Sequence, residues 1–392
     1  MKTIYIVAGA RTAVGTYGGS LKDIAPSALG ATVVREAVKR AAIDPASVGH
    51  VVFGQVIQSE PKDPFLARIA GIDGGVPKEA PALTLNRLCG SGLQAVLTAA
   101  HTIMLGDAEV AVAGGAESMS RIPYHSPSTR WGARFGDTGL VDALKGALTD
   151  PFHRILMGVT AENVAEQFGI SRDDQDAYAV ESHRRAARAT EEGRFRDQIV
   201  PVTVKQKRRE VQFTTDEHIR AEVSIEDLRA LPTVFKEGGS VTAGNASGMN
   251  DGAAALVLAS EEAVKAQGLK PMARLVSWGY AGVDPTIMGI GPVPASRIAM
   301  ERAGLTVDDF AVIEANEAFA AQACAVAREL NFDPARVNPN GSGISIGHPV
   351  GATGAINTVK CLYELERLKQ RHGLVTMCIG GGQGIAAIFE RV

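Results

Sequence analysis

Cysteine is scarce in this chain, which has only four cysteines in 392 residues and no Cys-x-x-Cys pair. A disulfide framework is therefore not expected, and a reducing compartment, the cytoplasm, is the predicted location. The eight histidines are scattered, and even the closest pairs, such as His101 and His125, stand 24 residues apart. Because no two ligands are neighbours in sequence, we expect no metal and no permanently bound cofactor.

A charge excess of either sign is also missing. The 40 basic and 43 acidic residues leave a net charge of −3, which provides no strong attraction for nucleic acid or a membrane surface. No apolar run approaches the roughly 18 residues of a membrane span, and residues 1–7 are typical of a strand rather than of a signal or transit peptide. We expect a globular protein with neither a nucleic-acid nor a membrane partner.

The chain does contain a regular alternation of short apolar strands and amphipathic helices, which favours an α/β fold. The spacing of apolar residues predicts strands at 4–7, 50–53, 82–85 and 109–113, and helices at 29–38 and 93–104. A similar order returns later, with strands at 310–313 and 374–379 and a helix that begins near 353. We therefore predict two half-chains built on one βαβ-rich plan.

A segment of different character separates the two halves. It holds Trp131 and a charge-dense stretch from Arg172 to Arg229, and it has the look of an insertion that covers a site and binds substrate. The predicted domains are an N-terminal half of residues 1–119 with 250–270, an inserted loop domain of 120–249, and a C-terminal half of 271–392.

Cys89 is the first candidate for chemistry. It follows a predicted strand and precedes Gly90-Ser91-Gly92, which open a helix. The free N–H groups and the positive dipole end of a helix would stabilise a thiolate, lower the pKa of the thiol and hold an oxyanion. The alternative is an inert buried cysteine.

His348 lies among three glycines between residues 347 and 354, at the place that Cys89 occupies in the first half. Histidine is the usual base that activates a thiol at neutral pH, although a structural hydrogen-bonding role is the common alternative. Cys378 ends an apolar strand and precedes three glycines. A second thiol at that place would act as an acid or base if it faced Cys89, and otherwise it packs in the core.

Polar and small residues follow the remaining strands. Asn316 stands directly after the strand at 310–313, where an amide would hold a water or an oxyanion, or only form a turn. Residues 243–252 form a loop of small residues that suits close approach of a ligand or a simple turn. Neither a full Gly-x-Gly-x-x-Gly nor a P-loop occurs, so nucleotide chemistry has no support.

Together these segments resemble the thiolase family, and in particular its bacterial acetyl-CoA acetyltransferases and β-ketothiolases. The resemblance covers the whole chain and is carried by five motifs in order: NRLCGSG at 86–92, GNASG at 244–248, NEAF at 316–319, GHP at 347–349 and CIGGG at 378–382. It implies a five-layer αβαβα fold, with the loop domain binding coenzyme A, and a homotetramer that is a dimer of dimers. Trp131 falls in the segment that matches the tetramerisation loop.

The resemblance also implies a reaction, the condensation of two acetyl-CoA to acetoacetyl-CoA and the reverse thiolysis. Cys89 would carry the acyl group, His348 would be its base, and Cys378 would remove the α-proton. The enolate would be held by His348 and a water on Asn316, and the acyl oxyanion by the N–H groups of Cys89 and Gly380. The direction in the cell and the pathway, whether polymer precursor synthesis or fatty-acid degradation, stay open.

Substrate-binding positions come from the resemblance alone. Arg220 and Ser247 match positions that contact CoA, and Ala243 is a further substrate-binding position. Phe235, Ala318 and Phe319 match neighbours of the pantetheine arm. Met157 and Met288 match residues of the acyl pocket. Leu156 departs from the family, which commonly has histidine there, and Asp227 stands where serine is frequent. We expect Leu156 to make the pocket less polar, so that acyl groups longer than acetoacetyl are accepted.

Other readings of the residues compete with this one. A ketoacyl synthase-like condensing enzyme also pairs cysteine with histidine, but it would not use a second cysteine such as Cys378 as base. A broad-range 3-ketoacyl-CoA thiolase, a cysteine hydrolase and a non-catalytic acyl-CoA-binding protein are the further alternatives. Protection of Cys89 from iodoacetamide by acetyl-CoA distinguishes an enzyme from the binding protein.

Overall fold

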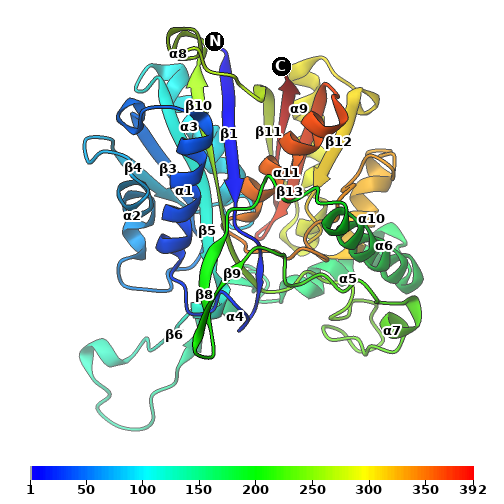
Figure 1. Ribbon diagram of the computed structural model, residues 1–392. Helices are drawn as coiled ribbons and strands as arrows, with labels where there is room; N and C mark the ends of the chain where they lie inside the picture. The colour runs from blue at the N-terminus through cyan, green and yellow to red at the C-terminus, as the bar shows by residue number, and fades with distance from the viewer. Residues whose placement is uncertain (1) are drawn as a thin grey trace.

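A ten-stranded mixed sheet organises residues 2–392, the part of the chain that the computed structural model describes (Figure 1). The order of the strands is β12-β13-β14-β11-β1-β10-β5-β3-β4, with the short β2 paired to β10. The first half contributes β1 (Ile4–Arg11), β2 (Gly15–Thr16), β3 (His50–Gly54), β4 (Ala82–Leu85), β5 (Val110–Ser118) and β10 (Asn250–Ser260). The second half contributes β11 (Ala273–Gly282), β12 (Phe310–Ala315), β13 (His372–Ile379) and β14 (Gln383–Arg391).

The sheet is two half-sheets joined by a short seam. Only two residue pairs, Tyr5 with Arg274 and Ile6 with Ala273, link β1 to β11. In each half two parallel strands, β3 with β5 and β12 with β13, continue into antiparallel neighbours. This repeated order confirms the prediction of two βαβ-rich halves.

Helices fill the layers around the half-sheets. α1 (Pro26–Ala41) and α2 (Leu66–Asp73) cover the first half, and α9 (Pro292–Ala303) and α10 (Ala320–Glu329) cover the second. α3 (Ser91–Leu105) and α11 (Thr353–Leu368) pack on each other between the two. Covered on both faces, β10 has all eleven residues buried and no polar alternation. The predicted α/β, five-layer αβαβα fold is confirmed.

The middle helix α3 corrects one expectation. The window Leu88–Leu105 is long and apolar enough for a membrane span by length and composition, contrary to the prediction that no run approaches this size. Its apolar character follows from its packing, because α3 lies against β3, β5 and α11 in the interior. Contact with α11 is close, since a Cβ on Gly92 would lie 2.6 Å from the backbone nitrogen of Ala355.

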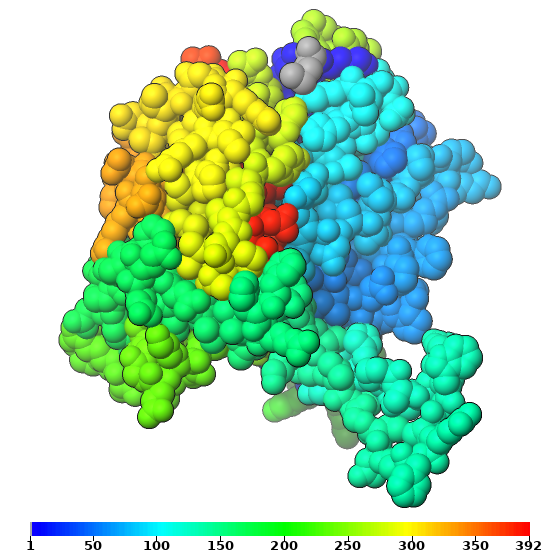
Figure 2. Space-filling model, turned by 180° about the vertical axis from the view of Figure 1, so that it is seen from behind, coloured from blue at the N-terminus to red at the C-terminus, as the bar shows by residue number. Residues whose placement is uncertain are grey.

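Residues 120–249 are mostly helical and irregular. They contain α4 (Ala143–Ala147), α5 (Met157–Phe168), α6 (Arg172–Glu191), α7 (Ile225–Arg229) and the hairpins β6 (Tyr124–His125) with β7 (Val141–Asp142) and β8 (Val202–Gln206) with β9 (Arg209–Phe213); α8 (Glu261–Gln267) follows β10. Between β6 and β7 the chain forms an arm that projects from the body (Figure 2). Trp131 and Phe135 on this arm are 91% and 101% exposed. The proposed domain boundaries stay a prediction.

Candidate active site

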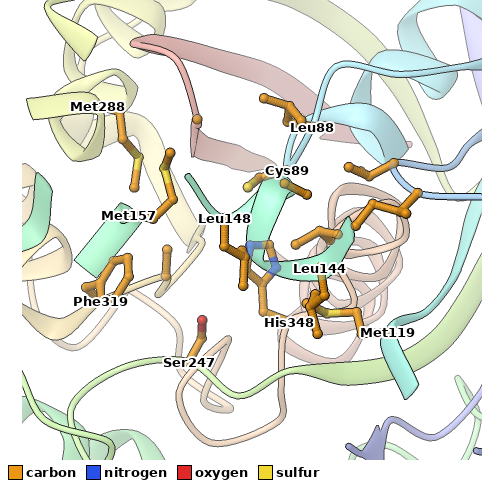
Figure 3. Close-up of a pocket in the computed structure, with 16 residues that line it drawn as sticks. Leu88, Cys89, Met119, Leu144, Leu148, Met157, Ser247, Met288, Phe319 and His348 are labelled. Carbon is orange, nitrogen blue, oxygen red and sulfur yellow. The ribbon is translucent and has the colours of Figure 1, made fainter. Parts of the chain in front are cut away.

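Two connected cavities lie where the halves and the inserted segment meet. The inner cavity holds about 60 Å³ and the outer about 550 Å³, a size that suits a small-molecule ligand. Both are lined by Met119, Leu144, Leu148, Met157, Ser247, Phe319, His348 and Val350. Figure 3 shows Cys89 and His348 directed into the same space, with Met157 and Met288 on another side.

A strained turn presents Cys89 to the inner cavity. It lies between β4 and α3, and the preceding Leu88 has a φ of 46°, which is unusual for a branched side chain. Two side chains hold the turn: Asn86 Oδ1 accepts the Leu88 N–H at 2.8 Å, and the Ser91 hydroxyl donates to the Leu88 carbonyl at 2.7 Å. The chain thus accepts local strain in order to place the thiol at the start of α3.

The Cys89 thiol does not have the lowered pKa that the sequence predicts. Burial raises its pKa above the usual value and outweighs the backbone N–H groups of Gly380 and Cys89, which lower it; the nearby Glu117 raises it further. The prediction was wrong because it counted the helix N-terminus but not desolvation. Cys89 therefore needs a base to become a thiolate at neutral pH.

His348 has the tautomer that a base requires. The Thr353 hydroxyl donates to the Pro349 carbonyl at 2.9 Å, so its oxygen is left to accept from His348 Nδ1 at 2.7 Å. Nδ1 therefore carries the proton, and the lone pair of Nε2 is left as an acceptor. Asn250 Oδ1 accepts the backbone N–H of His348 at 2.9 Å and fixes the loop. Burial lowers the pKa of His348 to about 4, so the imidazole is neutral at pH 7.

Asn316 completes this side of the site. Its Nδ2 lies 3.3 Å from His348 Nε2, and both side chains are buried. Its Oδ1 is buried without a partner among the described residues. A buried acceptor of this kind ordinarily binds water or a ligand donor, which agrees with the water-holding role predicted for Asn316.

Replacement of Thr353 by valine should reduce turnover about tenfold, because Nδ1 loses its acceptor and the imidazole loses both its tautomer and its orientation. The measurement is the steady-state kcat of the reaction proposed below, together with the thermal midpoint. Thr358→Val is the matched control, since this buried hydroxyl on the same helix donates only to the carbonyl of Gly354. Equal losses of kcat in the two variants would contradict the role of Thr353.

Cys378 is the penultimate residue of β13 and is completely buried. It packs with Met157, Met288 and Ala318, which also line the inner cavity. Burial raises its pKa far above the usual value, and the Cys89 thiol raises it further, although Cys378 itself lines neither cavity. Gly380 lines the inner cavity, and its backbone N–H lowers the pKa of Cys89.

The predicted substrate residues divide between the cavities. Met288 and Ala318 line the inner one, Phe235 and Ala243 the outer one, and Met157, Ser247 and Phe319 both. The Phe235 and Phe319 rings pack edge to face, with centroids 6.2 Å apart. Arg220 lines neither cavity and is exposed. Its backbone N–H donates a hydrogen bond to His183 Nδ1. Its contact with CoA stays a prediction.

The two departures from the family pattern have different surroundings. Leu156 is half-buried and lines the outer cavity, directly before α5. Asp227 is exposed and caps α7 reciprocally: Ser224 Oγ accepts the Asp227 N–H at 3.2 Å, and Asp227 Oδ2 accepts the Ser224 N–H at 3.0 Å. Asp227 thus has a local structural role, and Leu156 alone bears on a ligand.

Sequence reasoning missed several contributors. Thr353 and Asn250 hold His348, and Glu117 lies beside the site, yet none of them was singled out. Glu117 had a signal, because a carboxylate at the end of an apolar strand that follows two glycines is unusual in a core. The partner of Asn250 is set by a tertiary contact, whereas Thr353 bonds to His348 and Pro349, which lie five and four residues before it. Among residues 2–392 no group of three or more metal-ligating side chains occurs.

Comparison with known proteins agrees with this geometry. Residues 4–262 match the family described as "Thiolase, N-terminal domain", and residues 269–391 match "Thiolase, C-terminal domain". The chain is 64% identical to a protein of Cupriavidus necator named beta-ketothiolase BktB, and the alignment covers 100% of both chains.

Solved structures of other thiolases superpose closely on this chain. The acetyl-CoA acetyltransferase of Bacillus anthracis superposes with a TM-score of 0.98 at 47% identity and covers 100% of this chain and 99% of its own. Human mitochondrial 3-ketoacyl-CoA thiolase in complex with CoA superposes with a TM-score of 0.97 at 43% identity and covers 100% and 98%.

Proposed function

Because this chain belongs to the thiolase family, we propose that the paired cavities are its active site and that Cys89 is the acyl carrier. The enzyme is an acyltransferase that condenses two acetyl-CoA to acetoacetyl-CoA and CoA, and that runs the reverse thiolysis of 3-ketoacyl-CoA. CoA thioesters are its substrates. The observation that carries the assignment of the site is the convergence of the Cys89 thiol, a neutral His348 and the Gly380 N–H on one small cavity.

The first step transfers an acetyl group to Cys89. His348 Nε2 takes the thiol proton, and the sulfur attacks the thioester carbonyl of acetyl-CoA. The oxyanion is held by the N–H groups of Cys89 and Gly380, and each such donor is worth about 3 kcal/mol in comparable sites. As the C–S bond breaks, the CoA thiolate takes a proton from Cys378. The products are an acetyl thioester on Cys89, free CoA, an imidazolium and a Cys378 thiolate.

The second step forms the carbon–carbon bond. The Cys378 thiolate removes the α-proton of a second acetyl-CoA, and burial, which raises its pKa, makes it a strong base. His348, now protonated, and a water on Asn316 hold the enolate oxygen. The enolate carbon attacks the Cys89 thioester, and the Cys89 thiolate leaves and recovers its proton from His348. Every proton is accounted for, and acetoacetyl-CoA is released.

Loss of acetoacetyl-CoA absorbance on addition of CoA tests this function in the wild type and in Cys89→Ala. Release of free acid without transfer to CoA would identify a hydrolase instead. A second candidate, a broad-range 3-ketoacyl-CoA thiolase, is favoured by the apolar lining of the inner cavity, which includes Leu88, Leu144 and Leu148. Turnover of acyl groups of different length separates the two candidates.

Leu156→His tests the origin of chain-length preference. We expect the variant to lose about threefold to tenfold in kcat/KM for 3-ketohexanoyl-CoA relative to acetoacetyl-CoA, because a polar side chain beside the outer cavity disfavours an apolar chain. The measurement is thiolysis of both substrates by both proteins. Undetectable turnover of 3-ketohexanoyl-CoA by the wild type would refute the hypothesis.

The assembly and the location complete the proposal. The exposed aromatic side chains Trp131 and Phe135 on the projecting arm support a homotetramer, a dimer of dimers, that buries them. Sedimentation velocity would measure the mass, and a monomer would refute the tetramer. Four free cysteines support a cytoplasmic location, which fractionation of cells would test. We retain the expectation of no nucleic-acid or membrane partner.

A further inference from the structure

Glu117 is a buried carboxylate that none of the steps above uses. It lies near the end of β5 and has no exposed surface. Its Oε2 accepts the backbone N–H groups of Val56 at 2.8 Å and Gly351 at 2.9 Å, and its Oε1 accepts that of Ile57 at 3.2 Å. Within residues 2–392 no cationic side chain forms an ion pair with it. Backbone amides alone hold the carboxylate in place.

These three amides belong to two neighbouring segments of the wall of the inner cavity. Val56 and Ile57 line the cavity themselves and pack against Val350, which also lines it. Gly351 follows Val350 and belongs to the loop that carries His348. One carboxylate therefore joins the segment at Val56–Ile57 to the loop of the catalytic imidazole.

The backbone around this carboxylate is too closely packed to accept an added side chain. A Cβ on Gly351 would lie 2.4 Å from Glu117 Oε2 and 2.9 Å from the Cα of Gln55. A Cβ on Gly115 would lie 2.2 Å from the carbonyl oxygen of Gly351. Since the His348 loop rests directly on β5 here, the length of the Glu117 side chain fixes the spacing between this loop and the segment at Val56–Ile57.

The carboxylate also acts on the nucleophile electrostatically. Burial raises the pKa of Glu117 to about 8, the three amides lower it, and Asp63 raises it. Glu117 in turn raises the pKa of Cys89, and Cys378 is the other titratable group coupled to that thiol. The pH dependence of Cys89 alkylation therefore reports on the charge of Glu117.

We propose that Glu117 is a positioning residue for the reaction at Cys89, whose carboxylate holds the wall at Val56–Ile57 and the His348 loop at the separation that the acyl group requires. The inference rests on the proposed function. Glutamine has nearly the same shape but would direct an NH₂ group at backbone donors, so one of the two segments would lose its acceptor. Aspartate would keep the charge but is too short to reach both the segment at Val56–Ile57 and the His348 loop.

Glu117→Gln should lower kcat for thiolysis of acetoacetyl-CoA about tenfold and leave KM for CoA within about twofold, because the outer cavity is untouched. The pH midpoint of Cys89 alkylation by iodoacetamide should move to lower pH, because a nearby negative charge has gone. Glu117→Asp should also lose kcat but keep the midpoint of the wild type. This second variant still tests the spacing between Val56–Ile57 and the His348 loop if the glutamine variant does not fold.

Glu162→Gln is the matched control. Glu162 is also buried and accepts the backbone N–H groups of Ser240 at 2.8 Å and Val241 at 2.8 Å, but it lines neither cavity and makes no bond to the His348 loop. Wild-type kcat in Glu117→Gln, an unmoved alkylation midpoint, or an equal loss of kcat in Glu162→Gln would each overturn the inference. Absence of thiolysis in the wild type would instead overturn the proposed function, and the alkylation experiment, which needs no CoA, would still report on Glu117.

Discussion

Thiolysis of acetoacetyl-CoA is expected to fall by at least about 10⁴-fold when Cys89 is replaced by alanine, because the reaction then has no atom to carry the acyl group. No neighbouring group can take its place. Cys378 is completely buried, and the His348 imidazole is held by Thr353 and Asn316. The N–H groups of Gly380 and residue 89 would remain and would hold a carbonyl oxygen without reaction.

The measurement is the absorbance of acetoacetyl-CoA with CoA added, and the acyl-enzyme is sought by intact-protein mass after incubation with acetyl-CoA. Cys324→Ala is the matched control, since this partly exposed cysteine lines neither cavity, and it should retain wild-type turnover. Activity of Cys89→Ala within tenfold of the wild type, or acylation of a different residue, would rule out the acyl-carrier role.

Cys378→Ser is expected to reduce condensation and thiolysis about 10³-fold, the usual value of a well-placed general acid–base group. A hydroxyl ionises far less readily than a thiol, so the α-proton of the second acetyl-CoA would have no adequate base. Cys89 and His348 keep their contacts in this variant, and alkylation of Cys89 by iodoacetamide should persist. The acyl-enzyme should still accumulate from acetyl-CoA, although more slowly, because Cys378 also protonates the departing CoA.

In this variant, overall turnover should therefore fall much further than the rate of acyl-enzyme formation. Cys361→Ser is the matched control, because it makes the same change at a fully buried cysteine on α11 that lines neither cavity. Its thermal midpoint should fall while its turnover per folded molecule stays near that of the wild type. If Cys378→Ser slowed acylation and condensation by the same factor, the role as base would be lost and only proton donation to CoA would remain.

The architecture and the reacting groups could be predicted from the amino-acid sequence. Helix and strand periods are local properties, so the strands at 50–53 and 82–85 and the helix at 93–104 could be read from neighbouring residues, and each is present as β3, β4 and α3. Their return in the second half predicted the repeat. Cys89, His348 and Cys378 could be named because small residues at strand and helix ends are equally local signals, and the resemblance supplied their roles.

The behaviour of those groups depends on contacts that form when the chain folds. The pKa of Cys89 is raised, not lowered, because desolvation depends on everything that surrounds the sulfur, which the helix start next to it in the chain does not reveal. The Asn250 bond to His348 and the Glu117 bond to Gly351 join residues 98 and 234 positions apart. The resemblance places Arg220 with CoA, whereas Arg220 lines neither cavity, and its contact with CoA stays a prediction. Burial and hydrogen-bond partners are sums over contacts that folding creates, and no spacing along the chain encodes them.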